Sequence, residues 1–164
     1  MNFTQRMILI FVVLVSCVGC DQATKSIAVS VLPEMKTFSY LGDTLRLQLA
    51  YNRGAFLSLG SSLPDVWRHG VFTIGIGFFL IGALTIALFF KPGHFSLVLG
   101  VSLFSAGGIG NLIDRIANNG SVVDFINIGI GPVRTGIFNV ADIAIMAGSL
   151  LLFLAALRKT KMDR

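Results

Sequence analysis

Residues 71–90, with the sequence VFTIGIGFFLIGALTIALFF, contain no ionisable side chain. A helix of about 20 apolar residues is long enough to cross the ~30 Å hydrocarbon core of a bilayer, so this stretch predicts a transmembrane helix. The composition of the whole chain agrees: 54% of its 164 residues are hydrophobic, 13% are charged, and the mean hydropathy is +0.82. Soluble domains carry about 25% charged residues, and disordered chains are poor in apolar ones. The composition therefore excludes a soluble globular domain and a disordered chain, and it indicates a membrane protein.

Three further stretches are predicted to span the membrane, at residues 95–113, 140–157 and 7–29. The first two are clearly apolar. The N-terminal one is uncharged only over residues 7–20, and it reaches spanning length by running on through Asp21 and Lys25. We therefore expect one integral-membrane domain over residues 1–164, a polytopic α-helical fold with four transmembrane helices.

Two alternatives concern the N-terminal stretch. Leu14-Val15-Ser16-Cys17 resembles the cleavage site of a lipoprotein signal, which would make Cys17 the first residue of a mature chain; a retained helix fits three further spans better. Cys17 and Cys20 have C-x-x-C spacing, but the chain has no other cysteine to complete a zinc site. We therefore expect two small helical residues there, and no metal or other cofactor.

The distribution of basic residues predicts the orientation. With four spans both termini lie on one side, and the basic residues that collect there are Arg6, Lys91, Arg158, Lys159, Lys161 and Arg164. The positive-inside tendency makes that side cytoplasmic. The net charge of +5 is then an orientation signal, and we expect no nucleic-acid partner.

The two outer loops, residues 32–69 and 116–136, contain strand patterns. Apolar and polar residues alternate from Leu45 to Tyr51, the period-2 pattern of a half-buried strand, and Ser121–Ile128 is rich in β-branched residues. These patterns predict a small extracytoplasmic β-platform on the outer face of the helices.

Polar residues collect at the outer ends of the predicted helices. Charges at membrane depth are expensive and are functional candidates by default. The residues are Asp21, Lys25, Asn111, Asp114, Arg115, Asn139 and Asp142, together with Asp124 in the second outer loop. Structural roles are open for several: Asp21 and Lys25 have the i,i+4 spacing of a helix ion pair, Asp114 and Arg115 can tie helices together, and Asn52 with Gly54 can form a turn.

Asp124 and Asp142 are harder to explain as structural residues, because neither has a basic residue within four positions. Asp124 has apolar neighbours, which should raise its pKa. Asp142 is the third residue of its predicted helix, where the helix dipole favours the charged form. Two carboxyl groups in different environments are what an acid–base pair requires. We expect Asp142 to start ionised and Asp124 protonated.

Five short motifs occur in order along the chain: Asp21-Gln-Ala-Thr-Lys25, Asn52-Arg-Gly-Ala55, Gly110-Asn-Leu-Ile-Asp-Arg115, Val122-Val-Asp-Phe125 and Phe138-Asn-Val-Ala-Asp142. Each is weak alone. Together, at the outer helix ends, they resemble the bacterial lipoprotein signal peptidase family, also called type II signal peptidases. One departure is visible: many members have two alanines after the glycine of the second motif, whereas here Phe56 follows Ala55.

The resemblance implies an intramembrane aspartic endopeptidase of the bacterial inner membrane. Such an enzyme cleaves diacylglyceryl-modified prolipoproteins before the lipidated cysteine, works among membrane lipids without a cofactor, and is inhibited by globomycin-like cyclic peptides. The resemblance makes Asp124 and Asp142 the catalytic pair. It gives supporting or substrate-binding roles to Asp21, Lys25, Asn52, Gly54, Asn111, Asp114, Arg115 and Asn139. A small transporter or channel subunit is the alternative function, since buried charges can also line an ion path.

Overall fold

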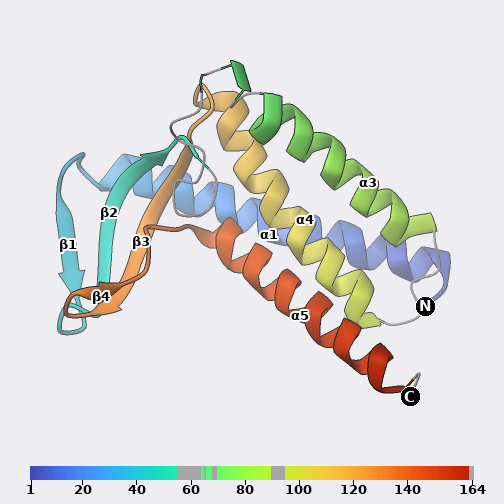
Figure 1. Ribbon diagram of the computed structural model, residues 1–164. Helices are drawn as coiled ribbons and strands as arrows, with labels where there is room; N and C mark the ends of the chain where they lie inside the picture. The colour runs from blue at the N-terminus through green and yellow to red at the C-terminus, as the bar shows by residue number, and fades with distance from the viewer. Residues whose placement is uncertain (55–63, 65, 68–69, 90–94, 163–164) are drawn as a thin grey trace.

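The computed structural model describes residues 1–54, 64, 66–67, 70–89 and 95–162, with side chains described as far as residue 157. Four helical segments are long and apolar enough to cross a membrane: Phe3–Val31, Gly70–Phe89, Phe95–Ala117 and Val140–Leu157. Figure 1 shows them side by side, with a small sheet at one end of the bundle. The predicted fold class is therefore confirmed.

The helices differ from the predicted ranges mainly at their ends. Helix α1 covers Phe3–Val31, and Asn2 begins it with a capping box in which Asn2 and Gln5 exchange hydrogen bonds. The second span starts with a π-helical segment, Gly70–Gly75, and continues as α3, Ile76–Phe89. Helix α4 covers Phe95–Ala117 and α5 covers Val140–Met162. The second outer loop was predicted to start at residue 116, but α4 continues to Ala117. Asp114 and Arg115 therefore lie within the last turn of the helix.

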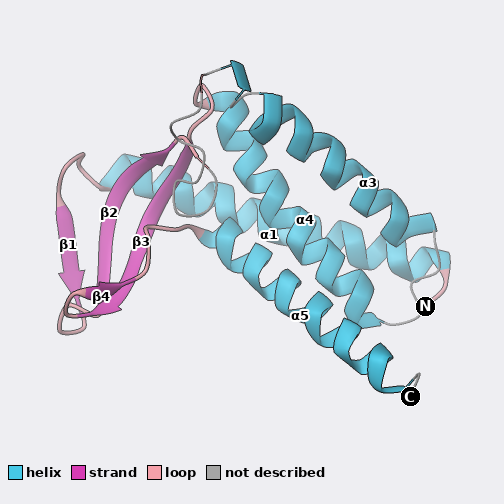
Figure 2. Ribbon diagram, in the orientation of Figure 1, coloured by secondary structure: helices cyan, strands magenta, loops and turns pink. Residues whose placement is uncertain are grey.

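The sheet is larger than the two strands predicted. Its order is β1-β2-β3-β4 and all neighbours are antiparallel. Strand β2 (Leu45–Asn52) and strand β3 (Val122–Ile130) match the two patterns seen in the sequence. Two short edge strands, β1 (Thr37–Tyr40) and β4 (Val133–Arg134), complete it (Figure 2). These two strands are too short to show an alternating pattern in the sequence. They form because β2 and β3 offer unpaired edges to them.

Helix α4 is central to the bundle, because it packs closely against α5 and α1. Small residues permit this approach: a Cβ at Gly107 would overlap the backbone of α5, and one at Gly148 would lie 2.5 Å from the Phe104 nitrogen of α4. Large apolar side chains on the outer surfaces of the helices are exposed, as expected for surfaces that face lipid.

Candidate active site

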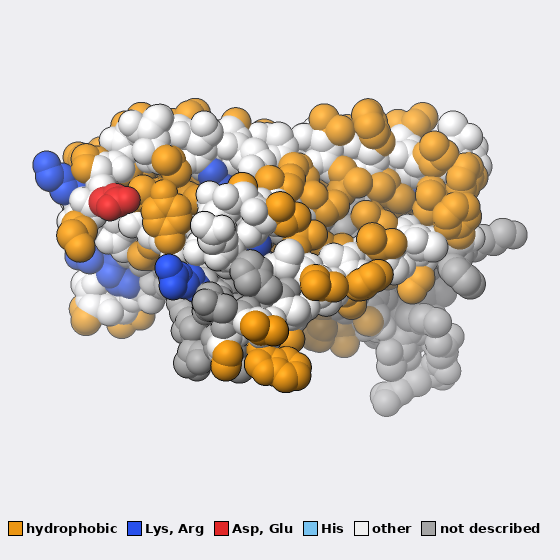
Figure 3. All heavy atoms as spheres, turned by 90° about the horizontal axis from the view of Figure 1, so that it is seen from above, with side chains coloured by type: hydrophobic (Ala, Val, Ile, Leu, Met, Phe, Trp, Pro, Cys, Tyr) orange, Lys and Arg blue, Asp and Glu red, His pale blue; other side chains and the backbone are white. Residues whose placement is uncertain are grey.

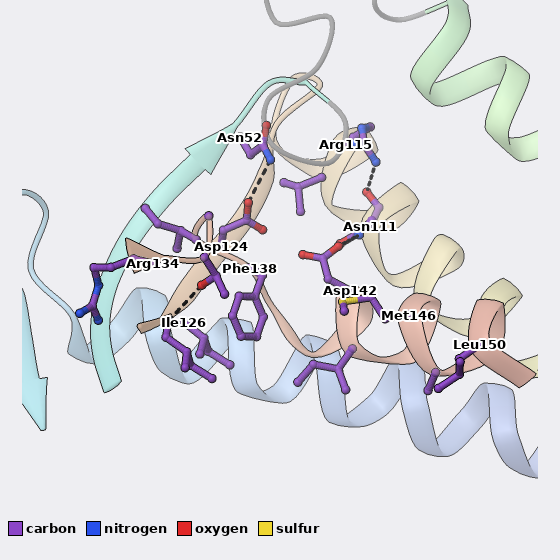
Figure 4. Close-up of a pocket in the computed structure, with 17 residues that line it drawn as sticks. Asn52, Asn111, Arg115, Asp124, Ile126, Arg134, Phe138, Asp142, Met146 and Leu150 are labelled. Carbon is purple, nitrogen blue, oxygen red and sulfur yellow. Dashed lines mark hydrogen bonds between the residues drawn. The ribbon is translucent and has the colours of Figure 1, made fainter. Parts of the chain in front are cut away.

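Asp124 and Asp142 line one pocket of about 980 Å³, although they lie on different elements. Alternate residues of β3 point to the same face, which brings Asp124 to the pocket with other β3 side chains. On α5 the lining residues recur at helical spacing from Asp142 to Leu150. Figure 4 shows the two carboxyl groups between β3 and the start of α5. Apolar lining residues include Val122, Ile126, Ile128, Phe138, Ile143, Met146 and Leu150.

The Asp124 side chain is almost fully buried, with 3% of its surface exposed. One carboxylate oxygen accepts a hydrogen bond from Asn139 Nδ2 at 2.7 Å and the other from Asn52 Nδ2 at 3.0 Å. Burial, with the negative charge of Asp142 as a second cause, raises the pKa of Asp124 to about 6, against the lowering effect of the two amide donors. The direction agrees with the sequence-based expectation.

Asp142 is held by the way α5 begins. Asn139 immediately precedes the helix, and its side-chain oxygen accepts from the Asp142 backbone N–H at 2.9 Å. Asp142 Oδ2 accepts in return from the Asn139 backbone N–H at 3.2 Å. This reciprocal pair is a capping box. The second oxygen of Asp142 accepts from Asn111 Nδ2 at 2.9 Å, so both oxygens have donors.

Asn139 connects the two acids. Its side chain is completely buried, and its Nδ2 lies 2.7 Å from Asp124 Oδ1, 3.1 Å from Asn111 Oδ1 and 3.3 Å from the Val123 carbonyl. Asp124 and Asp142 therefore belong to one hydrogen-bond network. A shift of the first residues of α5 would therefore move hydrogen-bond donors of both carboxyl groups.

Lys25 stands behind this network in a buried cluster. Its Nζ lies 2.8 Å from Asp21 Oδ2, 3.0 Å from Asp114 Oδ2 and 3.0 Å from Asn111 Oδ1. Lysine can only donate hydrogen bonds. Together with Asn139 it fixes the amide of Asn111 with its oxygen toward Lys25, and hence with its NH₂ group toward Asp142.

The two carboxylates bound to Lys25 also hold the elements that carry the acids. Asp21 Oδ1 accepts from the backbone N–H of Ala141, in the first turn of α5, at 2.8 Å. Asp114 Oδ2 accepts from the backbone N–H of Val123, in β3, at 2.8 Å. The predicted i,i+4 pair of Asp21 and Lys25 is present. It is one part of a cluster that aligns α5 and β3.

Arg115 and Asn52 hold the segment that follows β2. Arg115 is buried and its Nη2 donates to the Gly54 carbonyl at 2.9 Å. Gly54 N–H donates to Asn52 Oδ1 at 3.0 Å, which forms the predicted turn, while Asn52 Nδ2 contacts Asp124. Ala55 and Phe56, where the second motif departs from the family pattern, lie outside the described residues.

All the predicted site residues lie in or directly behind this pocket, and their assigned roles stay predictions. Gln22 was missed as a site residue: its Nε2 contacts Asp114 Oδ1 at 2.9 Å and both the Gly110 carbonyl and Asp21 Oδ2 at 3.2 Å. Its place next to Asp21 in the first motif was the available signal. The part of the pocket wall formed by residues 134–137 gives no sequence signal, whereas the adjoining Phe138 begins the fifth motif. In the described part of the chain, no group of His, Cys, Asp and Glu is arranged to hold a metal ion.

Comparisons with known proteins agree on one family. The family model described as signal peptidase (SPase) II matches residues 12–158. Similar proteins named lipoprotein signal peptidase occur in Streptococcus pneumoniae, with 32% identity over 92% of this chain and 94% of the relative. Another occurs in Treponema pallidum, with 36% identity over 86% of this chain and 78% of the relative.

Solved structures show the same fold. A bacterial membrane enzyme determined at 2.3 Å resolution superposes with a TM-score of 0.83 and 28% sequence identity, covering 94% of this chain and 91% of that one. The transporter alternative gains no support from these comparisons. The chain belongs to the signal peptidase II family, the lipoprotein signal peptidases, and is a multi-pass bacterial membrane peptidase of prolipoprotein processing.

Proposed function

We propose that the protein is an intramembrane aspartic endopeptidase whose catalytic pair is Asp124 and Asp142. It removes the signal peptide from diacylglyceryl-modified prolipoproteins by cleaving before the lipidated cysteine. The observation that carries this proposal is that two carboxyl groups line one pocket and share Asn139 as a neighbour: that of Asp124 on β3, which is buried, and that of Asp142 on α5, which is half-buried.

In the proposed mechanism the two acids start in different protonation states. Asp142, at the N-terminus of α5 with N–H donors on both oxygens, is the ionised base and takes a proton from a water molecule as that water attacks the scissile carbonyl carbon. Asp124, whose pKa is raised to about 6, donates its proton to the carbonyl oxygen as the tetrahedral gem-diol forms. When the gem-diol breaks down, Asp142 donates the proton it took from water to the leaving nitrogen, Asp124 takes a proton back from a gem-diol hydroxyl, and the C–N bond breaks. Both acids then have their starting protonation states again. The two acids titrate as a coupled pair.

The pocket also suits a lipid-modified substrate. Its α5 side is formed by Ile143, Met146 and Leu150, which are 50%, 62% and 57% exposed, so the pocket opens on the surface of a spanning helix. A lipidated cysteine can keep its acyl chains in the membrane while the adjacent peptide bond reaches the acids. Globomycin-like cyclic peptides, which pair apolar groups with a peptide backbone, are proposed to occupy the same pocket.

The proposed orientation places the site near the outer leaflet of the bacterial inner membrane. Helix α1 begins and α5 ends at one end of the bundle, and the sheet lies at the other (Figure 1). The basic flanks of the sequence favour the cytoplasm for the first end. The sheet is then extracytoplasmic.

The test uses purified protein reconstituted in lipid vesicles with a lipid-modified prolipoprotein. We expect Asp124→Asn and Asp142→Asn each to abolish cleavage, because an amide can neither give nor take the proton. Glu34→Gln, at an exposed acid outside the pocket, is the matched control and should cleave normally. Both aspartate variants must still bind globomycin, which shows that the pocket is folded. Retained cleavage in either one rejects the proposed pair.

A further inference from the structure

Two turns at the end of the sheet expose apolar side chains. Leu41, between β1 and β2, is 78% exposed, and Ile130 and Val133, on either side of the β3–β4 turn, are 80% and 78% exposed. Tyr40 beside Leu41 is 49% exposed. We call these four residues the sheet tip. Single exposed apolar residues are common, but a group of them marks an interaction surface.

The sheet tip is one connected unit, although its residues are far apart in the sequence. The Gly129 N–H donates to the Thr44 carbonyl at 2.9 Å, which joins the two turns. Arg134 fastens them further: its Nη1 donates to the Asp43 carbonyl at 2.7 Å, and its Nε donates to Asn127 Oδ1. The apolar side chains therefore lie on one rigid edge of the sheet.

Local structure does not account for the leucine at position 41. Its backbone has φ +53°, in the left-handed region, where Gly, Asn or Asp is usual. Its side chain is not buried against the rest of the described chain either. A bulky apolar residue that serves neither the turn nor the core is explained by a contact outside the molecule.

The place of the sheet tip identifies that contact as lipid. β4 leads directly into the segment before α5, and the pocket wall runs from Ile128, next to the tip, to Met146 and Leu150 on the exposed face of α5. The apolar surface of a spanning helix thus continues toward the tip. Figure 1 shows the strands running from the outer end of α1 to the α5 side of the molecule. Figure 3 shows apolar side chains over the helices and again at the sheet end, with Lys and Arg side chains among them.

We propose that the sheet tip inserts into the interfacial region of the bilayer and holds the sheet over the mouth of the pocket. Aliphatic side chains with an adjacent tyrosine are suited to the boundary between headgroups and acyl chains. Arg46 beside the tip is half-exposed and paired with Asp43, so it is the cation that would lie nearest to lipid phosphates. The inference rests on the membrane placement of the four helices and is independent of the catalytic roles proposed for the aspartates.

The test is depth-dependent fluorescence quenching in vesicles. Trp67 is the only tryptophan, so Trp67→Phe gives a silent background into which Ile130→Trp or Leu41→Trp is introduced. Thr37→Trp, an exposed position at the opposite end of β1, is the matched control. The probes are phosphatidylcholines brominated at shallow or deep acyl positions.

We expect blue-shifted emission and strong quenching by the shallow bromines for both tip variants, and neither for Thr37→Trp. The proposal is overturned if bromine quenching of the two tip variants is no stronger than quenching of Thr37→Trp. It is also overturned by a blue shift without quenching that grows with the protein-to-lipid ratio, which would make a second copy of the chain the partner. Because the readout needs no turnover, a failed cleavage assay and a failed insertion assay are separate results.

Discussion

Replacing Lys25 with methionine should remove the centre of the cluster that aligns the two acids. Methionine keeps the length and apolar part of the side chain, so the main change is loss of the positive charge. Lys25 is 3% exposed and lies within 3.0 Å of both Asp21 Oδ2 and Asp114 Oδ2. The substitution therefore leaves two buried carboxylates without their cation.

The size of the effect follows from that burial. Removing one partner of a buried ion pair destabilises a protein by about 3–5 kcal/mol. For a chain of this size, this corresponds to a fall in Tm on the order of 10 °C. Asp21 and Asp114 also bind the backbones of Ala141 and Val123, so their displacement should misalign α5 and β3. Misplacement of reacting groups lowers kcat by about 10–100-fold.

The assay combines thermal unfolding in detergent micelles with cleavage of a lipid-modified prolipoprotein. Lys36→Met, at an exposed lysine in the turn after α1, is the matched control and should change neither quantity. The double variant Lys25→Met, Asp21→Asn should recover part of the lost Tm, because it removes one uncompensated charge. An unchanged Tm for Lys25→Met, or a double variant less stable than the single one, would refute the reasoning.

Two further predictions concern the pH dependence and the close packing of the site. Because the pKa of Asp124 is raised to about 6 from 3.8, the folded state binds its proton more tightly than the unfolded chain; its contribution to stability is therefore full below about pH 4 and is lost as the pH rises to about 6. This part of the Tm should fall over that window, whereas the cleavage rate should fall as the pH rises through about 6, where the folded Asp124 loses its proton. Asp124→Asn should remove the Tm dependence; a Tm profile identical in both proteins contradicts the raised pKa. Gly110→Ala would place a Cβ 2.6 Å from Asp21 Oδ2, so it should lower both Tm and cleavage rate, whereas Gly82→Ala in α3 has no atom within 4 Å and should be neutral; equal effects of the two substitutions would show that the contact is unimportant.

Much of the architecture could be predicted because membrane proteins obey simple length and charge rules. Uncharged runs such as residues 71–90 had to be helices, since backbone groups in lipid need internal hydrogen bonds. The helix ends were less certain: α1 continues to Val31, and α4 includes Arg115 in its last turn. Polar residues at helix ends hide the boundary in a hydropathy pattern, because their burial depends on neighbouring elements.

Part of the site could also be predicted from the sequence. Local spacing showed the Asp21–Lys25 pair and the turn at Asn52, both of which need only nearby residues. It could not show that Lys25 also binds Asp114, or that Gln22 reaches the Gly110 carbonyl, because these contacts join helices separated by most of the chain.

The sequence by itself determined that this is a four-span membrane protein with its polar residues gathered at one end, since apolar length and charge position are local properties. Its ordered motifs also indicated the family. Only the tertiary structure decided that Asp124 and Asp142 open on a common pocket. That proximity depends on Asp21 binding the start of α5 and Asp114 binding β3, two contacts set by how the elements pack. The exposed sheet tip likewise exists only once two distant turns are joined through Gly129 and Arg134.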